Sequence, residues 1–114
     1  MDEFLSNLPL REPTFFILLS LSPEPKHGYA ILKGVENLSD GRVKLSTGTL
    51  YGAIKRLLDQ DWICRVDNPI PNDTDRERKS YKLTESGRSV LNAEIARLRK
   101  LVNIAQNQTA KETL

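Results

Sequence analysis

The residue types best suited to chemistry gather in one short stretch, LSTGTLYGAIKRL, between Leu45 and Leu57. Hydroxyl side chains stand near the expected start of a helix, and two cations follow about two turns later. Hydroxyls near a helix N-terminus contact phosphate oxygens, and a tyrosine and two cations on the same face of the helix can do so as well. The candidate DNA contacts in this stretch are therefore Ser46, Thr47, Thr49, Tyr51, Gly52, Lys55 and Arg56.

Gly52 is unusual because glycine in the middle of a helix costs roughly 1 kcal/mol relative to alanine. One explanation is that a neighbouring side chain of the same chain packs closely there. The other is that a small residue lets the helix approach a phosphate backbone or a groove wall. Tyr51 leaves a similar choice between a DNA contact and a core-edge tyrosine with its hydroxyl in water.

Other chemistry is poorly represented. His27 and Cys64 are the only histidine and the only cysteine, so neither a histidine-rich nor a cysteine-rich metal site can form. His27 is expected to help start a helix, and Cys64 to be a small core residue. The sequence shows no nucleophile with a partner base and no phosphate-binding glycine motif, so we expect no catalytic residue, no cofactor and no enzyme activity.

Size and charge limit the class of protein. The chain has 114 residues, a formal charge of +2 and a pI near 8.8, so it suggests one mildly basic domain that permits DNA binding without requiring it. The acidic start MDEF lacks the positive opening of a secretion signal. The apolar run FFILLSL is far shorter than the ~20 residues of a membrane helix. A cytoplasmic protein with no membrane partner is expected.

The elements that must position these residues follow from punctuation and periodicity. Helices are predicted over 11–22 and 27–38, and from Ser46, which can cap the third helix, to about Gln60. Two strands, DWICRV and RKSYKLT, flank the proline-rich loop DNPIPNDTDRE. A long helix capped by Thr84 follows. This order predicts an α+β, mainly α, fold: a winged helix-turn-helix with a long C-terminal dimerisation helix.

Two surfaces of this predicted fold carry function. Leu50, Ile54 and Leu57 form an apolar stripe that would turn the polar side of the third helix outward. The second strand follows a basic stretch, so Arg76, Arg78 and Lys79 are candidate phosphate contacts of a wing. A solvated strand edge is the alternative for these cations, and acidic residues in the same loop would weaken contacts with DNA.

Three motifs, HGYAI, STGTLYGAIKRLL and RKSYKLTESGRSVL, in this order closely resemble the PadR-like family of bacterial transcriptional regulators, from about Leu10 to about Ala105. The resemblance implies a homodimeric repressor whose third helix enters the major groove while the wing touches the flanking backbone. The contacts that it implies are Thr49, Tyr51, Lys55, Arg56, Arg76, Arg78 and Lys79. Two departures are Trp62, where family members more often carry a smaller aliphatic residue, and the acidic wing.

The long helix carries an apolar stripe with alternating spacings of four and three, the seam of a coiled coil. A second subunit would cover this stripe; packing onto the chain's own first helix is the alternative. The predicted dimerisation residues are Leu91, Ile95, Leu98, Leu101, Val102 and Ala105. The domains expected are a DNA-binding domain at 10–83, the dimerisation helix at 84–108, and flexible or docking termini at 1–9 and 109–114.

The predicted function is that of a sequence-specific DNA-binding transcriptional regulator, a repressor that binds a pseudo-palindromic double-stranded operator as a homodimer. The alternative is a winged-helix protein-interaction module, or an effector-sensing regulator with little direct DNA contact. A small apolar effector at the dimer centre is left open. A pore that stacks flat drugs is not supported, because the only tryptophan, Trp62, lies outside the long helix.

Overall fold

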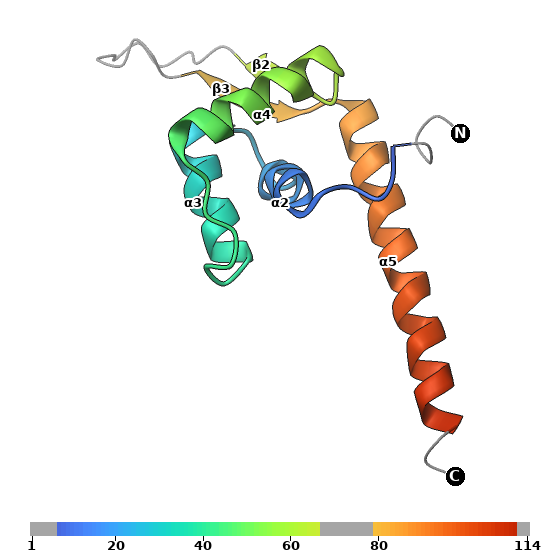
Figure 1. Ribbon diagram of the computed structural model, residues 1–114. Helices are drawn as coiled ribbons and strands as arrows, with labels where there is room; N and C mark the ends of the chain where they lie inside the picture. The colour runs from blue at the N-terminus through green and yellow to red at the C-terminus, as the bar shows by residue number, and fades with distance from the viewer. Residues whose placement is uncertain (1–6, 67–78, 112–114) are drawn as a thin grey trace.

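The computed structural model describes residues 7–66 and 79–111 and shows a helical domain with a small sheet and a projecting arm (Figure 1). The helices of the domain are α2 (Glu12–Leu21), α3 (Gly28–Leu38) and α4 (Thr47–Asp59), and the arm is α5 (Glu85–Lys111). The strands are β1 (Lys26–His27), β2 (Ile63–Val66) and β3 (Ser80–Leu83). The predicted α+β, mainly α, fold with a long C-terminal helix is confirmed, and the role of that helix in a dimer stays a prediction.

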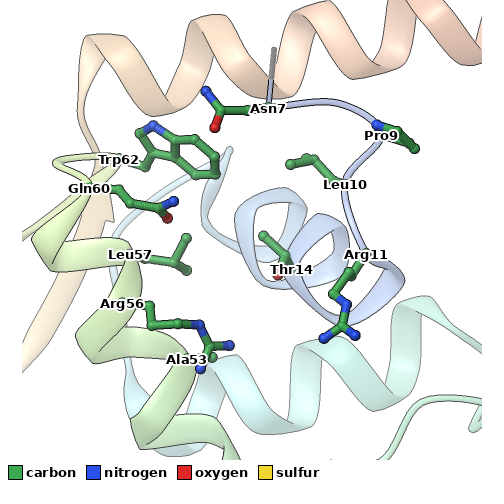
Figure 2. A pocket seen from close by; sticks show the side chains of 10 residues that line it. All are labelled: Asn7, Pro9, Leu10, Arg11, Thr14, Ala53, Arg56, Leu57, Gln60 and Trp62. Carbon is green, nitrogen blue, oxygen red and sulfur yellow. The ribbon is translucent and has the colours of Figure 1, made fainter. Parts of the chain in front are cut away.

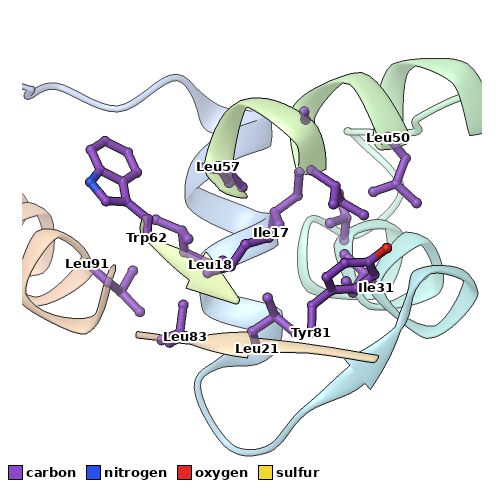
Figure 3. Packing of buried hydrophobic residues seen from close by; sticks show 14 of the residues in the cluster. Ile17, Leu18, Leu21, Ile31, Leu50, Leu57, Trp62, Tyr81, Leu83 and Leu91 are labelled. Atoms are coloured by element: carbon purple, nitrogen blue, oxygen red, sulfur yellow. The ribbon is translucent and has the colours of Figure 1, made fainter. Parts of the chain in front are cut away.

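Helix α2 lies at the centre of the described part of the domain (Figure 1). Proline is accepted in its first turn, where the N–H of that position would be unpaired anyway. Its apolar side chains Ile17, Leu18 and Leu21 are buried between the other elements (Figure 3). The helix crosses α3 closely, since a Cβ placed on Gly34 would lie 3.1 Å from the Cβ of Ser20. This packing holds α3, and with it α4, in a fixed place.

The sheet is antiparallel, with the strand order β1-β3-β2. The predicted hairpin of β2 and β3 is present, with Cys64 opposite Lys82. The two-residue strand β1 is an addition to the prediction. His27 ends that strand and stands at the N-cap of α3, but its side chain makes no cap bond; instead its Nδ1 lies 3.1 Å from the Ser80 hydroxyl of β3. It therefore also joins two strands.

Side chains alternate across the strands as the pleat requires. Tyr81 and Leu83 of β3 point into the core, whereas Lys82 between them is exposed. On β2 the buried residue is Ile63, so the next residue, Cys64, faces the other way and is only half-buried. The expectation that Cys64 is a core residue is therefore wrong.

The arm begins in close contact with the start of β2. Thr84 caps it as predicted: its hydroxyl accepts the Gly87 N–H at 3.0 Å, and its own N–H donates to the Trp62 carbonyl at 3.0 Å. A Cβ placed on Gly87 would lie only 2.8 Å from the carbonyl carbon of Trp62. The first turn of α5 is thus locked to the domain, backbone against backbone.

Candidate nucleic-acid interface

The start of α4 is fixed by its cap. Ser46 is the N-cap residue, and its hydroxyl oxygen accepts the Thr49 N–H at 3.1 Å. The same hydroxyl donates to the Thr49 Oγ1 at 2.9 Å. The predicted cap is confirmed, and it sets where the helix begins and so which residues share its outer side.

The inner side of α4 packs into the core through Leu50, Ala53, Ile54 and Leu57. Its outer side lies at the end of the domain opposite the C-terminal end of the arm (Figure 1). The predicted contact residues in α4 and its cap are all exposed: Ser46, Thr47, Thr49, Tyr51, Gly52, Lys55 and Arg56. Exposure is the condition that the prediction requires, and the DNA contact itself stays a prediction.

Two glycines form the middle of this outer side. Gly52 and Gly48, one turn earlier, are both exposed, and a Cβ placed on either would meet no atom of the described residues within 4 Å. The explanation that a neighbouring side chain requires glycine at these positions therefore finds no support in the described part of the chain. The pair leaves a strip of bare backbone that a second molecule can approach closely.

Tyr51 borders this strip on the side of α3. The residue is 46% exposed, yet its ring packs on the start of α3, because a Cβ placed on Gly28 would collide with its hydroxyl and lie 2.8 Å from its Cζ. Tyr81 lies nearby, and its pKa is raised above the ordinary value, mainly because the residue is buried. The charge of Arg65 and a hydrogen bond with Arg65 oppose this shift, whereas the neighbouring Tyr51 adds to it. Tyr51 is thus an edge tyrosine with one packed and one exposed side.

The candidate wing is only partly described. Lys79 is exposed immediately before β3, so it is accessible to a bound backbone. Arg76 and Arg78 lie outside the described residues. The wing contacts therefore stay a prediction.

Burial divides the arm into a first part that packs against its own domain and a second part that is exposed. In the first part Leu91 is buried in the core of its own domain and Ile95 packs against that core. This corrects the assignment of Leu91 to a dimer contact, because a buried core side chain offers no surface to a second chain. In the second part the predicted dimerisation residues Leu98, Leu101, Val102 and Ala105 are exposed, as is Ile104.

Glu94 stands between these two parts. It is 2% exposed, and its carboxylate accepts the Leu10 N–H at 3.1 Å and two N–H groups of Arg97 at 2.6 and 3.0 Å. The hydrogen bond from Arg97 lowers the pKa of Glu94, burial opposes this shift, and the Leu10 N–H reinforces it. In the sequence this pair looks like any surface Glu and Arg three residues apart, so its burial could not be predicted.

Because the pKa of Glu94 is lowered in the folded state, the stability of the fold depends on pH in the acid range. The Glu94 carboxylate stabilises the folded state above its ordinary pKa of 4.5, and this contribution is lost as the pH falls through the folded-state pKa. We expect Glu94→Gln to unfold at lower urea concentration than wild type at neutral pH, and to lose less stability on acidification. Glu85→Gln, a change at an exposed first-turn site of the same helix, should lose much less stability than Glu94→Gln, because water screens an exposed charge near a helix end. Equal acid dependence of Glu94→Gln and wild type would contradict the assignment.

A cavity of about 300 Å³ lies beside the C-terminal half of α4 (Figure 2). Arg11 and Arg56 stand at one end of it, and Trp62 and Asn7 at the opposite end. Arg56 is therefore on the flank of α4, whereas Lys55 is on its outer side. The lining residues are Asn7, Pro9, Leu10, Arg11, Thr14, Ala53, Arg56, Leu57, Gln60 and Trp62.

Metal sites and membrane spans do not occur in the described part of the chain. Among residues 7–66 and 79–111, no group of three or more His, Cys, Asp or Glu side chains could hold a metal ion. None of the helices in the same ranges combines the length and the apolar composition that crossing a bilayer requires.

Helices α2, α3 and α4, followed by the antiparallel strands β2 and β3, have the element order of a winged-helix protein. The model of the transcriptional regulator PadR-like family matches residues 17–93. The chain therefore belongs to the PadR-like family, whose members are regulators of transcription and not enzymes.

Solved structures agree with this assignment. A PadR family transcription regulator from Clostridium difficile R20291 is 24% identical, with a TM-score of 0.68 over 88% of this chain and 99% of that chain. Bacillus subtilis PadR, solved in complex with operator DNA, is 25% identical, with a TM-score of 0.65 over 76% of this chain and 47% of that chain. A search of curated protein sequences finds no match.

A more distant structure is BpsR of Bordetella bronchiseptica, whose DNA binding is regulated by 6-hydroxynicotinic acid. It is 18% identical, with a TM-score of 0.63 over 90% of this chain and 71% of that chain. At this identity the likeness concerns the fold alone.

Proposed function

We propose that this protein is a transcriptional repressor that binds a pseudo-palindromic operator as a homodimer, with α4 in the major groove. The observation that carries the proposal is the open strip at Gly48 and Gly52, which no described part of the chain fills. Glycine there costs helix stability, and close approach of a groove wall supplies a reason to keep it. Lys55 on the same side of α4 adds the positive charge that phosphates attract.

The homodimer is supported by the second part of α5. Its exposed apolar side chains Leu98, Leu101, Val102 and Ile104 continue the stripe beyond the domain core, and a second copy of the helix would cover them. Such a dimer would present two α4 helices to major grooves about 34 Å apart. The cytoplasmic location expected from the sequence belongs to the same proposal, as does a small apolar effector at the dimer centre.

The test uses the DNA upstream of the protein's own gene in footprinting and gel-shift titrations. We expect Lys55→Ala with Arg56→Ala to weaken binding and to make the dependence on salt less steep, by roughly 0.9 in the log–log slope for each phosphate that the variant no longer neutralises. The matched control is Lys100→Ala with Lys111→Ala, two exposed cations on the side of the arm opposite the apolar stripe.

Three results would count against the proposal. Unchanged affinity and salt slope in the folded α4 variant would remove α4 from the interface with DNA. Failure of the wild type to bind DNA, with salt-independent capture of a protein partner, would favour the alternative of an interaction module. One monomer bound per operator would contradict the homodimer.

A further inference from the structure

The last buried residue of the arm is charged. Along α5 the buried residues are Gly87, Val90, Leu91 and Glu94, and every described residue from Leu98 onward is exposed. Glu94 therefore stands where the arm leaves its own domain. An apolar side chain would satisfy the burial alone, so the carboxylate calls for a separate explanation.

The carboxylate joins two segments that are far apart in the sequence. The segment before α2 runs beside the first part of the arm (Figure 1), and the Leu10 N–H in it donates to Glu94 across 84 residues of chain. Arg97 holds the same carboxylate with two N–H groups. Charge-assisted bonds of this kind depend strongly on direction, whereas apolar burial does not. The cluster of Glu94, Arg97 and Leu10 thus restrains the angle of α5 as well as its attachment.

The length of the arm amplifies any error in that angle. Beyond Glu94 the helix continues to Lys111, which is roughly 25 Å at 1.5 Å per residue. A rotation of about 10° at Glu94 would move the far end by about 4 Å. One base-pair step along DNA is roughly 3.4 Å, so a small rotation in each protomer is enough to change the register of two bound half-sites.

We propose that Glu94 is a positioning residue: its bonds to Leu10 and Arg97 fix the angle between the arm and α4, and thereby the half-site spacing that the dimer accepts. The spacing part of this inference rests on the proposed function, whereas the angle is a property of the single chain. The two parts are therefore tested separately.

The angle is measured without DNA. Spin labels are attached to Cys64, the only native cysteine, and to Asn107→Cys on the exposed end of the arm, and the doubly labelled chain is diluted with unlabelled protein. The distance between labels should have one narrow distribution in wild type, broadened or shifted by Glu94→Ala and less so by Glu94→Gln, whose amide oxygen still accepts the Leu10 N–H. Glu85→Gln is the control. Unchanged distributions in folded Glu94→Gln and Glu94→Ala would overturn the inference.

The spacing is measured with operators lengthened or shortened by one or two base pairs. Wild type should bind the native spacing more tightly than the altered ones. In Glu94→Ala the ratio of these affinities should fall roughly tenfold, about the factor in an equilibrium constant that one charge-assisted hydrogen bond supplies. Affinity for a single half-site should not change, because α4 is untouched. An unchanged spacing preference would overturn the inference. Failure of wild type to bind any half-site would instead contradict the proposed function, and the label distances would still decide the role of Glu94.

Discussion

Replacing Gly52 with alanine will make the protein more stable and a weaker DNA binder. A Cβ at this position meets no described atom within 4 Å, so the new methyl group causes no clash within the described part of the chain. Alanine lowers the conformational entropy of the unfolded state and favours helix by roughly 1 kcal/mol. Urea unfolding should therefore show a higher midpoint for Gly52→Ala than for wild type.

Binding should change in the opposite direction. If the groove wall lies against the strip at Gly48 and Gly52, a methyl group at Gly52 forces the two surfaces apart, and affinity should fall by about tenfold or more, because several phosphate contacts lengthen together. Asn92→Ala, which adds no bulk at an exposed site of the arm, is the control and should bind DNA like wild type. A stabilised Gly52→Ala that binds the operator normally would show that DNA does not approach this strip.

The same chemical change at Gly87 should destabilise the fold. Here the added Cβ would lie 2.8 Å from the carbonyl carbon of Trp62, with the carbonyl oxygen closer still. The obstacle is backbone, so no rotation of a side chain can remove it. Relief requires a shift of the first turn of α5 away from β2, which would stretch the Thr84 N–H bond to the Trp62 carbonyl.

We expect the free energy of unfolding of Gly87→Ala to fall by at least about 1–3 kcal/mol, the usual cost of overpacking a tight contact. This loss should outweigh the higher helix propensity of alanine. The urea midpoint and the melting temperature should both fall, and Gly87→Ser should lower them further. Gly52→Ala is the matched comparison, since it makes the same substitution in a helix where space is open. A Gly87→Ala protein as stable as wild type would show that α5 is not held against β2 in solution.

These two glycines also show what the sequence can and cannot predict. Both stand near other small or polar residues within predicted helices, and their neighbours along the chain do not distinguish them. Their roles differ because of what lies beside them in the fold: Gly52 faces open space, whereas Gly87 lies against the Trp62 carbonyl. Spacing along a helix tells which side a residue occupies, but not what lies against it.

Features that depend on nearby residues in the chain were predicted well. The caps Ser46 and Thr84 and the apolar stripe of α4 follow from local hydrogen bonding and helix periodicity, and all three are present. Features that depend on distant partners were not. The strand β1 exists only because β3 pairs with it, and the burial of Glu94 requires Leu10. Likewise, α5 changes from buried to exposed between Leu91 and Leu98 because the domain that covers it ends there.

The position of Trp62 allows binding to be followed by the intrinsic tryptophan fluorescence of the unlabelled protein. It is the only tryptophan of the chain, it is 8% exposed, and its indole forms one wall of the cavity that Arg56 reaches from the other end. Indole emission shifts with the polarity around the ring, so a molecule that enters the cavity, or a displacement of the segment at Leu10, will change the colour of the emitted light. Titrations with candidate ligands can therefore be read directly from native protein.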